Sequence, residues 1–253
     1  MDLGLSGLRA LVTGGSKGIG LRCAEILAAE GASVSICART GADVEAVVGR
    51  LTAGGATAHG SAVDVSDKAA MERWVADAGE ALGGIDIVIG NVSALAVADD
   101  EDAWRSGFDT DMMHCVRLVN ASMPWLEKSD AASITLISSV SGREIDFTGP
   151  AYGAFKAAIV HYAQGLAYKL APKGIRANTV SPGNTYFEGG IWHGIESGDP
   201  TLFSEALALN PMGRMAKPEE VARGVVFLAS PASSFTSGAN LLVDGALTKG
   251  VQL

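Results

Sequence analysis

The chain has 253 residues, of which 48% are hydrophobic and 19% charged, and its formal net charge is −9. This composition supports a large core and excludes a disordered chain, while the negative charge argues against nucleic acid or an anionic membrane as the main partner. No apolar run reaches the roughly 18–20 residues that cross a bilayer, and residues 1–4 lack the basic start of a signal peptide, so we expect a soluble cytoplasmic protein without a membrane partner.

The cysteines and histidines show no pattern of a disulfide framework or a metal site. The three cysteines are far apart in the sequence, which favours buried thiols in a reducing compartment. The histidines form no HxH or HxxxH pair, so we expect isolated core or surface residues and no metal. They are Cys23, Cys37 and Cys115, with His59, His114, His161 and His193.

Short apolar runs alternate with longer amphipathic stretches along the chain. The apolar runs predict strands at 8–13, 33–37, 56–63, 85–89, 133–138, 174–180 and 239–243. The amphipathic stretches predict helices at about 18–30, 41–53, 67–82, 103–127, 151–171 and 218–229. This alternation predicts one α/β domain over residues 1–253, a doubly wound Rossmann fold whose seven-stranded, mostly parallel sheet has helices on both faces.

The segment at about 183–216 is the least regular part of the chain. It is rich in Gly and Pro and contains Tyr186, Phe187, Trp192 and Phe203. It is long for a connection in a compact domain, and such segments often form lids over a site. Two interpretations stay open: an apolar lid over a hydrophobic ketone, or aromatic anchors that hold the segment against the core.

A glycine-rich turn follows the first predicted strand and leads directly into a helix. Glycines let the backbone turn tightly and approach a pyrophosphate, and the helix N-terminus offers unpaired N–H groups and a positive dipole. The turn predicts a dinucleotide site. Its candidate binding residues are Gly14, Ser16, Lys17, Gly18, Ile19 and Gly20.

The end of the second predicted strand indicates which dinucleotide binds. A carboxylate there would bind the ribose hydroxyls of NAD and repel a 2′-phosphate. The chain has Ala38-Arg39 instead, with no acid before Asp43. Arg39 and Lys17 are suited to a phosphate, so we expect NADP, with NADPH favoured over NADH.

Tyr152 and Lys156 are four residues apart and share one face of a predicted helix. A nearby ammonium stabilises a phenolate, so Lys156 would let Tyr152 act as a general acid or base closer to neutral pH. Ser139 lies thirteen positions upstream, just after the fifth predicted strand, where it could donate a hydrogen bond to a substrate carbonyl. These residues predict hydride transfer between a nicotinamide and a small-molecule substrate, either a ketone or a secondary alcohol.

The TGxxxGxG turn, the Ser-to-Tyr spacing and the YxxxK pair resemble the short-chain dehydrogenase/reductase family, including its 3-oxoacyl-reductase-like and hydroxysteroid-dehydrogenase-like members. The likeness extends over nearly the whole chain, through Ser181-Pro182-Gly183 and Val243-Asp244-Gly245. It implies a homotetramer. It also implies cofactor contacts from Asp64, Val65, Asn91, Val92, Tyr152, Lys156, Pro182, Gly183 and Thr185.

The chain departs from the family pattern at three positions. The segment Gly90-Asn91-Val92-Ser93 replaces the family's NNAG, and Phe187 stands where a threonine is usual, so Thr185 is a candidate substitute. Asp111 stands where the family has an asparagine that connects the lysine to solvent through a water. We include Asp111 among the catalytic candidates and expect its carboxylate to offset the charge of Lys156 and shift activity to higher pH.

Two other classes of function are compatible with parts of the sequence. Asp111 and the altered segment 90–93 would suit a nucleotide-binding sensor or scaffold with weak or no catalysis, although Ser139, Tyr152 and Lys156 argue against it. Cofactor-free lyase chemistry, as in haloalcohol dehalogenases, is disfavoured by the complete glycine turn and by the lysine. The substrate is open. Residues Arg143, Glu144 and Asp146 lie between Ser139 and Tyr152 and could bound its pocket.

Overall fold

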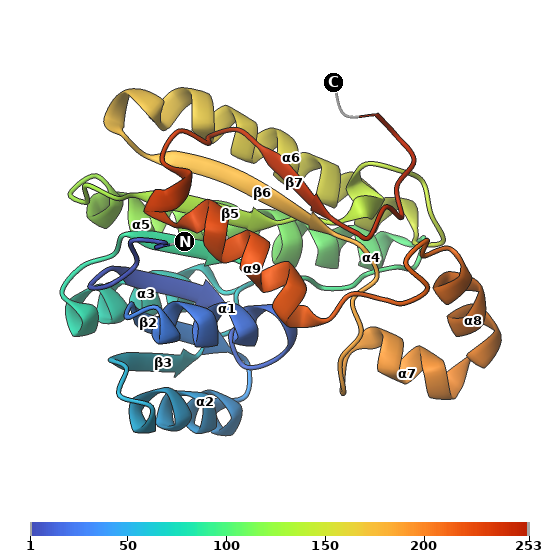
Figure 1. Ribbon diagram of the computed structural model, residues 1–253, viewed down its shortest axis with the longest axis horizontal. Coiled ribbons are helices and arrows are strands. Elements are labelled where there is room, and N and C mark those ends of the chain that lie inside the picture. The colour runs from blue at the N-terminus through green and yellow to red at the C-terminus, as the bar shows by residue number, and fades with distance from the viewer. Residues whose placement is uncertain (1, 252–253) are drawn as a thin grey trace.

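The computed structural model describes residues 2–251, which contain one sheet of seven parallel strands with helices on both faces (Figure 1). The strand order is β3-β2-β1-β4-β5-β6-β7. The predicted doubly wound Rossmann fold is therefore confirmed, and the sheet is parallel throughout. The strands are β1 (Arg9–Thr13), β2 (Ser33–Ala38), β3 (Ala58–Ala62), β4 (Ile87–Gly90), β5 (Ser133–Ile137), β6 (Arg176–Pro182) and β7 (Asn240–Val243).

Two hydrophobic cores cover the two faces of the sheet. One core packs α1, α2 and α9 against the sheet, and the other packs α3, α5 and α6. The inner strands β1, β4 and β5 are buried on both faces, which is why they read as apolar runs, while the edge strands β3 and β7 are only partly buried. The helices are α1 (Gly18–Ala29), α2 (Gly41–Ala53), α3 (Lys68–Leu82), α4 (Glu101–Gly107), α5 (Met113–Leu126), α6 (Pro150–Leu170), α7 (Ile191–Gly198), α8 (Pro200–Ala208) and α9 (Pro218–Ala229).

The strand order reverses between β1 and β4, which are hydrogen-bonded neighbours although two strands separate them in sequence. The loops after β1 and β4 therefore leave the sheet toward opposite faces and open a crevice at the carboxyl ends of the strands. In doubly wound folds this crevice is where ligands bind. None of the helices in residues 2–251 is long and apolar enough to cross a membrane.

The structure corrects two of the expected elements. The helix expected over 103–127 is divided: a π-helical turn, η1 (Phe108–Met112), separates α4 from α5. The segment 183–216 is not irregular over much of its length, because it contains α7 and α8, which project from the body at the right of Figure 1. Asp199 caps α8 by accepting a hydrogen bond from the N–H of Leu202, and Pro200 occupies the first turn. This cap is an ordinary helix-start signal.

Candidate active site

A cavity of about 550 Å³ opens at the carboxyl ends of the strands, beside the switch in strand order. The predicted site residues line it, apart from Gly20 and Asp111, which lie behind the lining. The topology thus gathers side chains from the loops after β1, β2, β3, β4, β5 and β6 into one crevice. The lining includes Gly14, Ser16, Lys17, Gly18, Ile19, Arg39, Asp64, Val65, Asn91, Val92, Ser139, Tyr152, Lys156, Pro182, Gly183 and Thr185.

The glycine turn after β1 leaves a hollow that side chains on its glycines would fill. Gly14 and Gly18 have φ of +64° and +56°, in the left-handed region that favours glycine. A Cβ on Gly20 would lie 2.3 Å from the carbonyl oxygen of Gly14. No side chain of the described residues caps α1, so its first N–H groups are available to an anion. The residues present therefore fit the pyrophosphate of a dinucleotide.

Asn91 ties this turn to the end of β4. Its backbone N–H donates to Thr13 Oγ1 at 2.9 Å, and its Nδ2 donates to the carbonyl oxygen of Thr13 at 3.2 Å. Val92 packs against Gly14, where a Cβ would come within 3.1 Å of Val92 Cγ2. Asn91 thus positions the glycine turn through hydrogen bonds, and Val92 narrows the space beside Gly14.

Phe187 closes the other side of the turn. Its ring lies so close to Gly18 that a Cβ there would be 2.7 Å from Phe187 Cζ. Thr185 donates its hydroxyl to the carbonyl oxygen of Gly183 at 3.1 Å, so its proton is held by its own loop. The ring of Phe187 therefore covers the glycine turn, and Thr185 lines the cavity beside it.

The two residues expected to select NADP over NAD line the cavity. Arg39 and Lys17 are both exposed and both line it, and neither forms an ion pair with another described residue. Asp64 accepts hydrogen bonds from Ser66, and these bonds, together with the charge of Arg39, lower the pKa of its carboxyl. Two cations therefore face the cavity with their charges available to a phosphate.

Tyr152 and Lys156 are presented by the first two turns of α6, and Ser139 follows β5. The Lys156 ammonium lies 5.5 Å from the centre of the Tyr152 ring and donates to the carbonyl oxygen of Ile137 at 3.3 Å. Lys156 is only 2% exposed. Burial works to lower its pKa, but the charges of Asp111 and Tyr152 outweigh burial and raise the pKa above its ordinary value. The lysine is therefore a fixed cation beneath the tyrosine.

Asp111 lies in η1, outside the cavity lining, and contacts Lys156. Its Oδ1 is 3.0 Å from Lys156 Nζ, and both side chains are 2% exposed. Its Oδ2 accepts a hydrogen bond from the N–H of Ala94 at 2.9 Å, which holds the loop after β4. The π-helical turn widens the helix at this point, and such turns are frequent at functional sites. The sequence analysis gave Asp111 the relay position, and the structure brings it into contact with Lys156.

Comparison with known proteins identifies the family of the chain. A family model described as enoyl-(acyl carrier protein) reductase matches residues 14–248. The chain belongs to the short-chain dehydrogenase/reductase family. The isoepoxydon dehydrogenases patN of Penicillium expansum and Aspergillus clavatus are 42% and 40% identical to it, over 100% and 98% of this chain and 99% and 97% of theirs.

Solved structures agree with the sequence comparison. An NADPH-bound short-chain oxidoreductase from Pseudomonas aeruginosa PAO1, described as containing an atypical catalytic center, has a TM-score of 0.90 and 31% identity over 96% of this chain and 98% of that one. As a short-chain dehydrogenase/reductase, the chain is an oxidoreductase that interconverts alcohols and ketones with a nicotinamide nucleotide.

His114 is a buried part of this short-chain dehydrogenase/reductase site that the sequence analysis left as an isolated histidine. Its Nε2 lies 2.9 Å from Thr13 Oγ1, the same oxygen that accepts the N–H of Asn91. Burial lowers its pKa to about 4, and the charge of Lys156 adds to this while Asp111 opposes it. His114 is therefore neutral at neutral pH and joins α5 to the cofactor turn. No motif marks it, because the contact depends on the break at η1.

We expect His114 to make the stability of the fold depend on pH. Its pKa is lower in the folded state than its ordinary 6.5, so between pH 6.5 and 4 the unfolded chain binds a proton that the folded chain does not. The free energy of unfolding should fall by about 3 kcal/mol across this interval from His114 alone. Urea titrations at several pH values measure it. His114→Gln should lose this dependence and the exposed His161→Gln should keep it; equal slopes in both variants would contradict the assignment.

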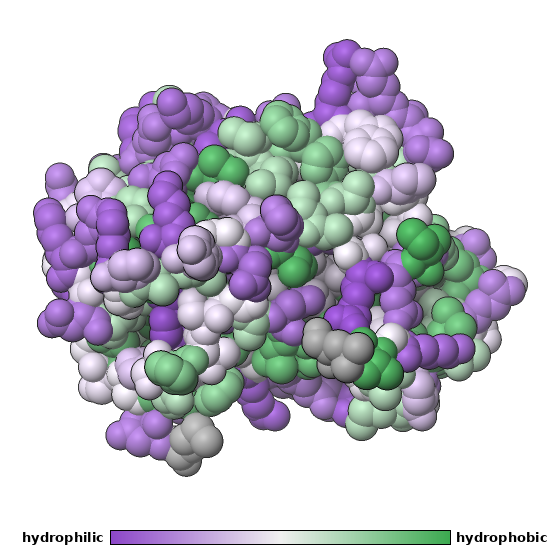
Figure 2. All heavy atoms as spheres, turned by 90° about the horizontal axis from the view of Figure 1, so that it is seen from above, coloured by the Kyte–Doolittle hydropathy of each residue, from purple (hydrophilic) through white to green (hydrophobic). Residues whose placement is uncertain are grey.

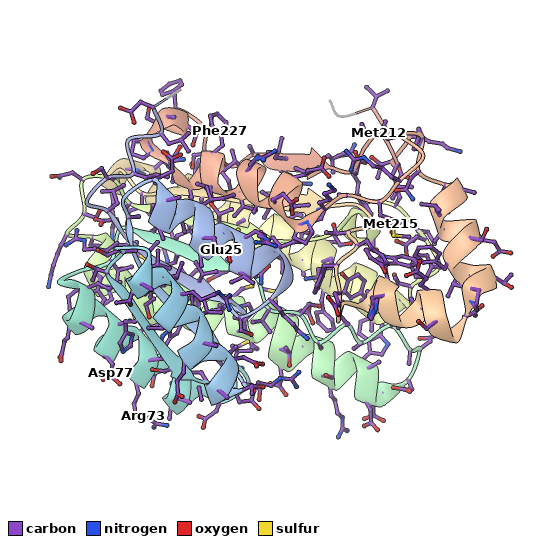
Figure 3. The ribbon with its side chains drawn as sticks, turned by 60° about the horizontal axis from the view of Figure 1, so that its bottom comes forward. Glu25, Arg73, Asp77, Met212, Met215 and Phe227 are labelled. Atoms are coloured by element: carbon purple, nitrogen blue, oxygen red, sulfur yellow. The ribbon has the colours of Figure 1, made fainter. Side chains whose placement is uncertain are left out.

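Residues of α7 line one end of the cavity. Trp192 is buried and packs against Phe147 at 5.3 Å and Phe203 at 6.5 Å between ring centres. Met215 belongs to the same hydrophobic cluster as Trp192, whereas Met212 is exposed. Figure 3 shows both methionines on the connection between α8 and α9. In Figure 2 hydrophobic residues also show on the right-hand lobe, where Figure 1 places these helices. Trp192 is compatible both with an anchor and with a lid, because it packs the segment against other aromatic rings and also lines the cavity.

Proposed function

We propose that this enzyme uses NADP to interconvert a small, largely apolar ketone and its secondary alcohol, with Tyr152 as the group that transfers the proton. The observation that carries the proposal is the shared cavity: Ser139, Tyr152 and Lys156 line the same crevice as the glycine turn. The bound nicotinamide would donate or accept the hydride. The phosphates would be held at the turn by Gly14 to Gly20, and the ribose by Tyr152 and Lys156.

The protein's own part is proton transfer and electrostatic positioning. In the reductive direction, Ser139 donates a hydrogen bond to the carbonyl oxygen, and Tyr152 gives its hydroxyl proton to that oxygen. Lys156 stabilises the phenolate that remains. Asp111 fixes the Lys156 ammonium and offsets part of its charge, which we expect to move activity to higher pH. In the oxidative direction the same groups act in reverse.

Turnover assays test the proposal. The relatives named isoepoxydon dehydrogenase make isoepoxydon the first substrate to try with NADP, followed by a panel of cyclic and aromatic ketones with NADPH. Oxidation of an alcohol or reduction of a ketone is the expected result. Tight binding of NADPH with no turnover of any compound would favour the alternative of a nucleotide sensor.

We expect NADPH to bind more tightly than NADH, and Arg39 to be responsible. Arg39→Asp removes a guanidinium that can donate two hydrogen bonds to a phosphate and places there a carboxylate that repels it. NADPH affinity should fall about 10- to 100-fold in a fluorescence titration, with NADH binding retained. Arg73→Asp is the matched control, since Arg73 is exposed on α3, away from the cavity (Figure 3). Equal losses in both variants, or a wild-type preference for NADH, would overturn the assignment.

We also propose a cytoplasmic homotetramer that packs through α6 and the C-terminal segment. Tyr168 on α6 is 88% exposed and Phe235 is fully exposed, and large apolar side chains that protrude in this way favour burial in an interface. The mass of the purified protein in solution tests the assembly, and a monomer at micromolar concentration would contradict it.

A further inference from the structure

A chain of hydrogen bonds leads from Ser139 to a carboxylate that lines the cavity. Ser139 Oγ lies 3.1 Å from Ser141 Oγ, and Ser141 donates its hydroxyl to Asp146 Oδ2 at 2.5 Å. Ser139, Ser141 and Asp146 all line the cavity. Thr148 holds the carboxylate in place, donating its N–H and its hydroxyl to Asp146 Oδ1 at 2.9 and 2.7 Å. The sequence analysis placed Asp146 near the pocket but gave it no role.

The chemistry of the groups sets the direction of this chain. A carboxylate only accepts hydrogen bonds, so Ser141 must give its one hydroxyl proton to Asp146. Ser141 Oγ can then only accept, and the available donor is the hydroxyl of Ser139. Ser139 Oγ in turn accepts the backbone N–H of Ser141 at 3.2 Å. In this structure the proton of Ser139 is therefore directed to Ser141.

A reacting ketone changes this arrangement. Ser139 must turn its proton toward the carbonyl oxygen, and Ser141 Oγ then loses its donor. A substrate hydroxyl next to the carbonyl could replace it, because the two serine oxygens are spaced much like two oxygens on neighbouring carbons. Asp146 can take part as well: an ionised carboxylate has about four acceptor sites, and three hydrogen bonds to it are formed here.

We propose that Ser141 and Asp146 form a specificity subsite that binds a hydroxyl group carried next to the reacting carbonyl. The preferred substrates are then α-hydroxy ketones and the corresponding diols. A ketone without this hydroxyl leaves Ser141 Oγ without a donor when Ser139 engages the carbonyl. The inference rests on the proposed function, since it assigns Ser139 to the carbonyl.

Matched pairs of substrates test the subsite. We would compare α-hydroxycyclohexanone with cyclohexanone, and further pairs of the same kind, in wild type, Ser141→Ala and Asp146→Asn with NADPH. Wild type should show a kcat/KM about tenfold higher for the hydroxy ketone, the ratio expected for one additional hydrogen bond. Ser141→Ala should bring this ratio close to one, because alanine has no oxygen to accept a hydrogen bond from the substrate hydroxyl.

Asp146→Asn gives a second and independent measurement. Its amide keeps an oxygen for the N–H of Thr148 and can turn its NH₂ toward Ser141, which reverses the direction of the chain. The hydroxy-ketone preference should fall in this variant too, without a change in melting temperature. Asp130→Asn is the matched control, because Asp130 is exposed just before β5, at the end of the strand away from the cavity. It should behave as wild type.

Two outcomes would count against the subsite in different ways. Turnover of both ketones with equal kcat/KM in wild type, or an equal loss for both in the variants, would overturn the subsite and leave the proposed function standing. Binding of NADPH without turnover of any ketone or alcohol would overturn the proposed function, and the subsite with it.

Discussion

Tyr152→Phe should lower kcat for ketone reduction by about 10²- to 10⁴-fold, the range by which a positioned proton donor accelerates a reaction. The substitution removes one oxygen and keeps the ring beside Lys156, whose ammonium lies 5.5 Å from the ring centre. Packing in α6 is therefore preserved. NADPH affinity should fall by no more than about tenfold, the value of the one hydrogen bond that the hydroxyl would make to the ribose. The larger loss should appear in kcat, because the hydroxyl acts on the reacting oxygen. Steady-state kinetics with a fluorescence titration of NADPH measure both quantities.

Tyr168→Phe is the control for this substitution. It makes the same chemical change on the same helix, at a side chain that is 88% exposed, and it should leave kcat unchanged. If Tyr152→Phe kept the wild-type kcat, proton transfer by Tyr152 would be refuted and the donor would have to be sought elsewhere in the cavity.

Asp111→Asn should cost about 3–5 kcal/mol of stability and move the pH–rate profile to lower pH. Asp111 and Lys156 are 3.0 Å apart and both 2% exposed, so the substitution leaves a buried ammonium without its counter-ion. The new amide cannot satisfy both neighbours. One side of Asp111 faces the Lys156 ammonium and the other faces the N–H of Ala94, so the NH₂ group meets a donor in either orientation. Urea denaturation and the pH dependence of kcat measure the two effects.

The direction of the pH effect follows from the two charges. With the carboxylate removed, the ammonium stabilises the Tyr152 phenolate without opposition. The limb of the profile that depends on Tyr152 then moves to lower pH, which is the acidic limb for alcohol oxidation and the alkaline limb for ketone reduction. The pKa of Lys156, which Asp111 raises against the effect of burial, should fall, so activity is also lost at a lower alkaline pH. In wild type the ion pair contributes fully below the ordinary lysine pKa of 10.5 and is lost only above it.

Asp109→Asn supplies the comparison within the same π-helical turn. Asp109 is 54% exposed, and its oxygen is 3.4 Å from Arg117, so the substitution should cost less than about 1 kcal/mol. A loss of this small size for Asp111→Asn as well, together with an unmoved pH–rate profile, would show that Asp111 has no part in positioning Lys156.

Patterns that repeat along the chain were sufficient to predict the fold. All seven strands start within two residues of their predicted starts. The inner strands β1, β4 and β5 are apolar runs buried on both faces of the sheet, whereas the edge strands β3 and β7 are only partly buried. The cavity residues were found for a related reason: in a parallel sheet, residues that follow strands meet at one edge, and Gly14, Asn91 and Ser139 all follow strands.

Contacts that depend on local breaks or on side-chain direction could not be predicted in the same way. The π-helical turn η1 changes the face of every residue after it, so the approach of His114 to Thr13 has no signature in helical periodicity. The bonds from Ser139 through Ser141 to Asp146 depend on how the loop after β5 folds back. In contrast, α8 begins at an ordinary helix-start signal, Asp199-Pro200, which the sequence analysis did not use.

The most direct test of the central claim is to follow the transferred hydrogen. The enzyme would be given NADPH with both hydrogens at the reactive carbon of the nicotinamide replaced by deuterium, together with a ketone that it turns over. The product alcohol would be examined by mass spectrometry and NMR. We predict one deuterium on the carbinol carbon in wild type and almost no product from Tyr152→Phe. An alcohol without deuterium, or equal product from both proteins, would contradict hydride transfer assisted by Tyr152.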